Sequence, residues 1–172
     1  MSGSSSVFWI GGKTKYSNAL WWKELGPDSK PTHFNYDLYF YLEDPTAPEA
    51  LEFDVNQTID GTRYVWGTEC SYRNTGHWQI WDTAGGKWFS TDVACPQVSA
   101  KQWHHLVWHL ERVGNQAHYI GVTLDGNYMP VEKYFDPHKY GKQGISVAVQ
   151  LDGDYRQSPY KLWIDQMSLI RW

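Results

Sequence analysis

The sequence of 172 residues lacks any run of about 18 apolar residues, the length that a membrane-spanning helix requires. It also lacks an excess of basic side chains. The net charge is −4, so we expect neither nucleic acid nor a membrane surface as a partner. The start, MSGSSSVFW, has neither the basic nor the apolar segment of a signal peptide. We treat residues 1–6 as a tag or linker remnant and expect one domain over residues 7–172.

Cysteine is scarce, and Cys70 and Cys95 are the only two. They form no CxxC pair and, with scattered histidines, make a poor zinc signature. A disulfide between them would close a loop of about 25 residues and contribute roughly 3 kcal/mol. The alternative is two buried free thiols. We favour the disulfide and therefore a secreted or periplasmic protein, because disulfides persist in oxidising compartments.

Motifs for several enzyme classes are absent. No GxSxG, P-loop or GxGxxG occurs, which argues against serine hydrolases and nucleotide enzymes. His104, His105 and His109 lie close in sequence, but on a strand only His105 and His109 share a face, so the three do not converge on a metal. We expect no cofactor, unless Asp165 binds a structural calcium ion as described below.

Period-2 alternation of apolar and polar residues is present throughout, whereas helical periodicity is not. Turn residues such as Asp60-Gly61 and Asp125-Gly126 separate about ten such segments. This pattern predicts an all-β fold, a two-sheet antiparallel jelly-roll sandwich. The apolar positions predict a core that includes Phe34, Tyr36, Leu38, Phe40, Phe53, Val55, Ile80, Val147, Val149 and Ile164.

The segment ALEFDVNQ, residues 50–57, places Glu52 and Asp54 on one face of a strand, where neighbouring acids repel each other. If Asp60-Gly61 forms a two-residue type I′ turn, Glu52 lies opposite Glu69 and Asp54 lies opposite Gly67. The two glutamates would then lie roughly 5 Å apart, and one of them should have a raised pKa. A one-residue slip would remove this pairing.

The following hairpins extend the same face. A loop over residues 73–77 would place Trp81 opposite Glu69 and Gln79 opposite Ser71, and a four-residue loop would place Trp81 opposite Trp88. Carboxylates and amides beside indole rings suit carbohydrate binding, because sugar CH groups stack on aromatic rings while hydroxyls donate to oxygens. The sequence also holds 11 Trp and 12 Tyr. The alternative is an ordinary solvated sheet face, since β-proteins favour aromatic residues in any case.

Three stretches resemble the concanavalin A-like lectin/glucanase superfamily. Residues 103–127 look like a laminin-G-like pair of strands, and residues 160–172 look like the superfamily's closing strand. Residues 50–57 are similar to the family 16 glycoside hydrolase strand, E-x-D-x-E or E-x-D-x-x-E. The resemblance implies a jelly roll that handles carbohydrate. It also implies a structural calcium near the closing strand, with Asp165 as a ligand. The Arg- and Tyr-bearing motifs of jelly-roll polysaccharide lyases are not found.

By this resemblance Glu52 matches the nucleophile and Asp54 the acid beside it. Asn56 and Gln57 stand where the acid/base glutamate belongs. An amide cannot protonate a leaving group, so the standard retaining mechanism lacks its general acid. Either the site binds sugar without cleaving it, or Glu69 supplies the acid.

We therefore expect a monomeric domain that binds a polysaccharide or oligosaccharide on its concave face. The alternatives are an endo-acting glycoside hydrolase of β-glucan type, and a non-carbohydrate adhesion or interaction domain. As an enzyme, it would use Glu52, Asp54 and Glu69. The expected sugar-binding residues are Asn56, Gln79, Trp81, Trp88, Tyr39 and Tyr41.

Overall fold

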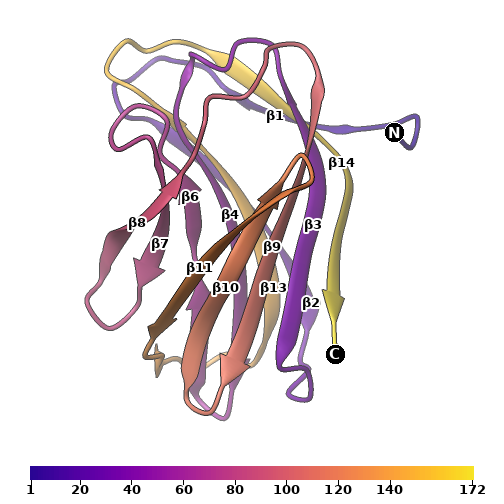
Figure 1. The fold of residues 1–172 in the computed structure, drawn as a ribbon, viewed down its shortest axis with the longest axis vertical. Coiled ribbons are helices and arrows are strands. Elements are labelled where there is room, and N and C mark those ends of the chain that lie inside the picture. Colours follow the sequence, from indigo (N-terminus) through magenta and orange to yellow (C-terminus); the bar gives the residue numbers. More distant parts are fainter.

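The computed structural model describes residues 1–172 as two antiparallel sheets packed face to face (Figure 1). The six-stranded sheet has the order β1 (Ser6–Ile10), β14 (Tyr160–Arg171), β3 (His33–Leu42), β9 (Trp103–Val113), β10 (Gln116–Leu124) and β11 (Asn127–Phe135). This is the all-β jelly-roll sandwich that the sequence predicts.

The eight-stranded sheet is built around β4 (Pro48–Ile59). One edge of β4 pairs with β13 (Gly144–Gly153), which in turn pairs with β2 (Asn18–Gly26). The other edge pairs first with β5 (Thr62–Trp66) and then with β6 (Thr68–Cys70). Beyond them lie β12 (His138–Lys139), β7 (His77–Asp82) and β8 (Lys87–Ala94).

The core fills the space between the two sheets and follows the alternation of the sequence. In β3 every second side chain, from Phe34 to Leu42, is buried, and the side chains between them are half-exposed. All ten predicted core residues are buried. Each large apolar side chain contributes about 1.5–3 kcal/mol when it is fully removed from water. The alternate side chains of each strand point away from this core, so the outer face of each sheet can carry polar groups.

The turn between β4 and β5 fixes the register of the acid-bearing strand. Asp60 and Gly61 both have positive φ, 47° and 76°, as a type I′ turn requires. Ile59 consequently pairs with Thr62, and the same register continues to Glu52 opposite Glu69. The predicted pairing of the two glutamates is confirmed.

The hairpin between β6 and β7 differs from the prediction. Gln79, not Trp81, lies opposite Glu69, because the loop occupies residues 72–76 instead of 73–77. Its closure is fixed by the Ser71 amide, which donates to His77 O, and by the Gly76 amide, which donates to Ser71 O. The error is two residues in register, so every side chain keeps its predicted face.

Residues 6–26 form two strands that the period-2 pattern does not predict. Both β1 and β2 have mostly exposed side chains, so neither shows a clear apolar face in the sequence. Strand β13 continues through Leu151, Asp152 and Gly153, and this places the Asp152 carboxyl on the same sheet as Glu52.

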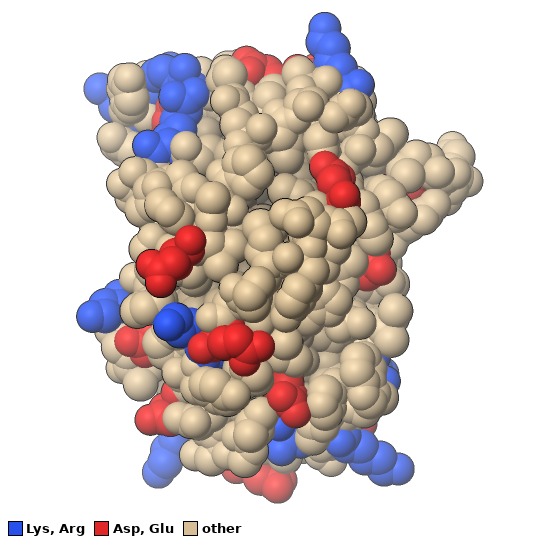
Figure 2. All heavy atoms as spheres, in the orientation of Figure 1, with Lys and Arg blue, Asp and Glu red and all other residues tan.

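Charged side chains of both signs are scattered over the face of the molecule seen in Figure 2, around a broad uncharged centre. No helix of the structure could cross a lipid bilayer.

Cys70 and Cys95 form the predicted disulfide, with their Cα atoms 5.7 Å apart. It ties the end of β6 to the segment that follows β8, and both cysteines are buried. The bond therefore holds the strand that carries Glu69 against the core.

We expect the Cys70→Ala/Cys95→Ala double variant to unfold with a free energy about 3 kcal/mol lower, because the loop of 25 residues is no longer closed in the unfolded chain. Urea denaturation followed by tryptophan fluorescence measures this change. An unfolding free energy equal to that of the oxidised wild type would contradict it.

Candidate functional site

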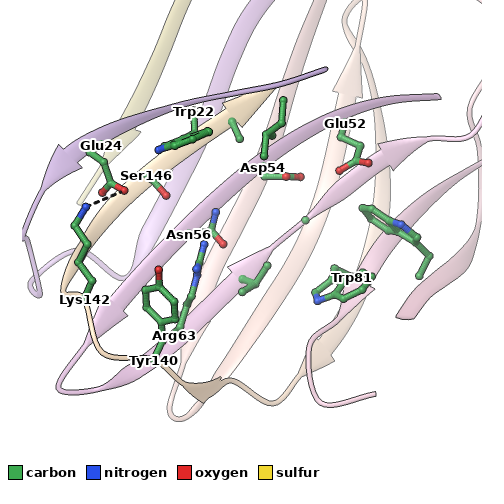
Figure 3. A pocket seen from close by; sticks show the side chains of 15 residues that line it. Trp22, Glu24, Glu52, Asp54, Asn56, Arg63, Trp81, Tyr140, Lys142 and Ser146 are labelled. Atoms are coloured by element: carbon green, nitrogen blue, oxygen red, sulfur yellow. Dashed lines mark ion pairs between the residues drawn. The ribbon is translucent and has the colours of Figure 1, made fainter. Parts of the chain in front are cut away.

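A groove of about 700 Å³ lies on the outer face of the eight-stranded sheet (Figure 3). Strand β4 supplies Glu52, Asp54 and Asn56 to it, because alternate residues of a strand share a face. Its volume lies within the range of small-ligand sites. The groove is lined by Leu20, Trp22, Glu24, Glu52, Asp54, Asn56, Arg63, Val65, Gly67, Trp81, Trp88, Tyr140, Lys142, Ser146 and Ala148.

Three carboxyl groups converge where one end of the groove meets a smaller pocket, which Glu69 and Asp152 line together with Glu52. Oxygen atoms of Glu52, Glu69 and Asp152 lie within 4.8 Å of one another. Glu69 arrives through the β4–β6 pairing, and Asp152 through β13, whose Gln150 lies directly opposite Glu52. We call these three residues together with Asp54 the acid end.

The acid end holds protons at neutral pH. Burial, and then the charges of Asp54, Asp152 and Glu69, raise the pKa of Glu52 far above its ordinary value. Burial and the charge of Asp152 raise the pKa of Glu69 to about 7. Burial also raises the pKa of Asp152, while its hydrogen bonds with Glu52 and Gln150 oppose that shift. Because Glu52 shows the largest shift of the three, we place a proton there.

Hydrogen bonds around the acid end fit this assignment. The Gln150 amide donates to Glu52 Oε1 and, over 3.0 Å, to Asp152 Oδ1. The other oxygen of Asp152, Oδ2, is buried and has no donor. A proton on the neighbouring Glu52 carboxyl supplies the donor that Asp152 needs. The same three carboxyls are the only group of three metal-ligating side chains close enough to share an ion, which would have to displace that proton.

Asp54 lies farther along β4 in a tightly packed position. Its Oδ1 accepts a hydrogen bond of 3.0 Å from the Thr68 amide. Burial raises the pKa of Asp54, and that hydrogen bond and the charge of Arg63 oppose the rise. Across from it, a Cβ atom on Gly67 would lie 2.9 Å from the Trp81 Cβ. Glycine is therefore required for Trp81 to lie beside the acid.

Two indoles flank the acid end. Trp81 and Trp88 are opposite each other on β7 and β8, as predicted, with ring centroids 5.3 Å apart and planes at 76°. Trp81 lies beside Gly67, whose carbonyl accepts from the Trp81 amide at 3.0 Å. Gln79 is buried opposite Glu69 and lines the smaller pocket next to the groove, as Trp88 does.

The other end of the groove is basic, which the sequence did not indicate. Arg63 of β5 lies over the ring of Tyr140, with 4.5 Å from Cζ to the ring centroid. Tyr140 and Lys142 both lie in the connection between β12 and β13. Lys142 forms an ion pair with Glu24 of β2, with 3.5 Å between Lys142 Nζ and Glu24 Oε1. We call Arg63, Tyr140 and Lys142 the basic end. No short motif links them, and only the unpredicted pairing of β12 with β5 brings Tyr140 to Arg63.

The remaining predicted residues divide between the two sheets. Asn56 lies in the floor of the groove, as expected, and is nine-tenths buried. Tyr39 and Tyr41 do not reach the groove, because they lie on the outer face of the six-stranded sheet. There Tyr39 stacks on His105 and Tyr41 packs against Trp103. The structure therefore does not bring them together with the other predicted sugar-binding residues, and a role for them in sugar binding stays a prediction. Alternation gives the face of a strand and not the sheet that the strand joins.

Asp165 lies on β14, in the six-stranded sheet, away from the groove. Its carboxylate accepts hydrogen bonds from the backbone amide and the hydroxyl of Ser2. The hydrogen bond from the Ser2 hydroxyl is the main cause that lowers the pKa of Asp165. A calcium ion at Asp165 stays a prediction.

Comparison with known proteins identifies the fold. No protein-family model matches the chain, and no curated protein matches it in sequence. Among solved structures, the alginate lyase Aly36B superimposes with a TM-score of 0.64 at 12% identity, over 99% of this chain and 83% of that one. An endo-β-1,4-glucuronan lyase from the fungus Trichoderma reesei superimposes with a TM-score of 0.59 at 14% identity, over 98% of this chain and 82% of that one. The cellulose-induced protein Cip1 superimposes with a TM-score of 0.60 at 10% identity, over 99% of this chain and 81% of that one.

At these identities the likeness shows a shared fold and no more. The chain therefore shares the two-sheet jelly-roll fold of these proteins. The narrower likeness to family 16 glycoside hydrolases and laminin-G-like domains stays a prediction.

The raised carboxyl pKa values predict how stability depends on pH. Between the ordinary and the raised pKa, the folded protein binds more protons than the unfolded chain, so its stability falls as pH rises. For Glu69 this window extends from 4.5 to about 7. We expect the free energy of unfolding to decrease from pH 5 to pH 8, and to decrease less in the Glu52→Gln/Glu69→Gln variant.

Urea denaturation at the two pH values measures this dependence. The histidines are common to both proteins, so they cancel in the comparison. Equal pH dependence in wild type and variant would show that Glu52 and Glu69 do not hold extra protons in the folded state.

Proposed function

We propose that the groove binds a polysaccharide or oligosaccharide. The observation that carries this proposal is the arrangement of Trp81 and Trp88 beside Glu52, Glu69 and Gln79 on one sheet face. A half-buried indole offers a flat apolar surface to the CH groups of a sugar ring, and carboxyl and amide oxygens accept its hydroxyls.

The solved structures with this fold support a carbohydrate ligand at the level of analogy. They include the alginate lyase Aly36B in complex with an alginate trisaccharide, with a TM-score of 0.62. The transglycosylase Crh5 superimposes with a TM-score of 0.53. One fold can carry unrelated functions, so the argument depends on the groove itself. An adhesion domain without a sugar site is less supported, because Trp81 and Trp88 line an open groove.

We place the protein in an oxidising compartment, secreted or periplasmic. The Cys70–Cys95 disulfide supports this, since such bonds are rarely maintained in a reducing cytosol.

Replacement of the indoles tests the binding proposal. We expect Trp81→Ala and Trp88→Ala each to weaken binding about tenfold or more, because the stacking surface is lost. A glycan array identifies the ligand, and calorimetry with soluble β-glucans and xylans measures the affinity.

Trp9→Ala is the matched control, since Trp9 is 62% exposed on β1, away from the groove. Failure of the wild type to bind any glycan would contradict the proposal. Equal losses in Trp9→Ala and Trp81→Ala would also contradict it.

A second candidate function is glycoside hydrolysis, which the separation of Glu52 and Glu69 favours. Retaining enzymes hold their two carboxyl groups about 5–5.5 Å apart. Oxygens of Glu52 and Glu69 lie within 4.8 Å. The raised pKa suits Glu52 as the proton donor, and Glu69, with a pKa of about 7, then suits the nucleophile. These roles reverse those implied by the family 16 resemblance.

Release of reducing sugar from β-glucans or xylans tests this second candidate. Glu52→Gln and Glu69→Gln should each reduce the rate at least about 100-fold, because each removes a carboxyl that participates in bond cleavage. Glu43→Gln, an exposed acid beyond the end of β3, is the control. Activity that persists in Glu52→Gln would exclude Glu52 from catalysis.

A further inference from the structure

The groove is lined by carboxyl groups at one end and by Arg63 and Lys142 at the other (Figure 3). Along β4 the acid end begins at Glu52, and the basic end lies beyond Asn56, next to Arg63 on the neighbouring strand. Asn56 lies four residue steps along the strand from Glu52, about 13 Å at the usual rise. This length exceeds one sugar ring, so the two ends would contact different units of a bound chain.

Arg63 has no directly bonded partner. Its half-buried side chain takes part in no ion pair and no hydrogen bond, and its charge acts on Asp54 without a direct contact. Its Nε is shielded from water and has no acceptor. The ring of Tyr140 covers one face of the guanidinium, and the terminal N–H groups, which are neither hydrogen-bonded nor fully buried, are the donors that a ligand can reach. A buried donor without an acceptor is costly, and a carboxylate is the acceptor that matches a guanidinium fork.

Asn56 has an unused acceptor in the same place. It is nine-tenths buried, and its Oδ1 has no donor. Asn56, Arg63, Lys142 and Ser146 all line a recess of about 30 Å³ that adjoins the groove. An unpaired acceptor and an unpaired cationic donor thus belong to residues that line the same recess. Together they suit a group that is both an anion and a hydroxyl donor, such as an acidic sugar.

Lys142 adds a second positive charge that a ligand can recruit. Its only ion pair is with Glu24, and both side chains are largely exposed, 70% and 46%. Such a pair is weak, so an incoming carboxylate can compete with Glu24 for the ammonium group.

We propose that the basic end is a subsite for the carboxylate of a uronic acid unit, while the acid end takes neutral sugars. This inference rests on the proposed function and specifies its ligand class, a polysaccharide that contains both neutral and uronate units. Arg63 clamps the carboxylate, Lys142 adds positive charge, and Asn56 accepts a hydroxyl. A chain composed only of uronates fits less well, because its carboxylates would also meet Glu52, Asp54 and Glu69.

Polysaccharides of three charge classes test the proposal: a neutral xylan or β-glucan, a glucuronoxylan, and a polyuronate such as alginate. The two acidic polymers are also prepared with their carboxyl groups reduced to alcohols. Affinity electrophoresis and calorimetry compare them. We expect wild type to bind glucuronoxylan at least about tenfold more tightly than its carboxyl-reduced form, and more tightly than the polyuronate.

The variants assign the preference to residues. In Arg63→Gln the ratio of the affinity for native glucuronoxylan to the affinity for its carboxyl-reduced form should fall to about one. In Lys142→Gln the same ratio should fall severalfold. Lys142 is exposed, so its replacement leaves the fold intact even if Arg63→Gln unfolds. Arg171→Gln, at the end of β14 outside the groove, should retain the wild-type ratio.

The outcomes separate the two proposals. If the carboxyl-reduced and native polymers bind equally, the uronate subsite is wrong while carbohydrate binding stands. Tightest binding to the polyuronate would overturn the assignment of the acid end to neutral sugars. Absence of binding to every polymer would contradict the proposed function itself.

Discussion

The site depends on one hairpin. Asp60 and Gly61 take up positive φ, and this tight turn fixes the pairing of β4 with β5 and then β6. Side chains alternate along a strand, so a slip of one residue would turn Glu52 and Asp54 into the core and Phe53 into water. Burial of Phe53 and Val55 therefore holds the acids on the groove face. The hydrophobic core and the polar groove are two consequences of the same register.

That register keeps together groups that repel each other. Glu52, Glu69 and Asp152 would separate in a flexible loop, but each is on a paired strand with its neighbours fixed. The cluster responds by retaining protons, which burial favours. Arg63 presents the converse problem at the other end of the groove, a buried cationic donor without a hydrogen-bond acceptor. Both features reduce stability, and a bound sugar that carries hydroxyls and a carboxylate would relieve both.

Local patterns in the sequence predicted the fold, the core, the disulfide and the Glu52–Glu69 pair, because alternation and a two-residue turn are short-range signals. The pairing of Trp81 with Trp88 was predicted for the same reason. The loop before β7 was misplaced by one residue at each end, since a five-residue loop has no unique register. The basic end could not be predicted, because Arg63 and Tyr140 are far apart in sequence and meet only through β12. The position of Tyr39 and Tyr41 away from the groove could not be predicted, because alternation gives the face of a strand and not its sheet.

We propose that a sugar chain lies along the groove, between Trp81 and Arg63. A crystal structure of the protein with a bound glucuronoxylan oligosaccharide would locate the chain. We expect a neutral sugar ring stacked on Trp81 or Trp88, with its hydroxyls on the acid end and the uronate carboxylate on Arg63. The same oligosaccharide bound on the outer face of the six-stranded sheet, around Tyr39 and Tyr41, would contradict it.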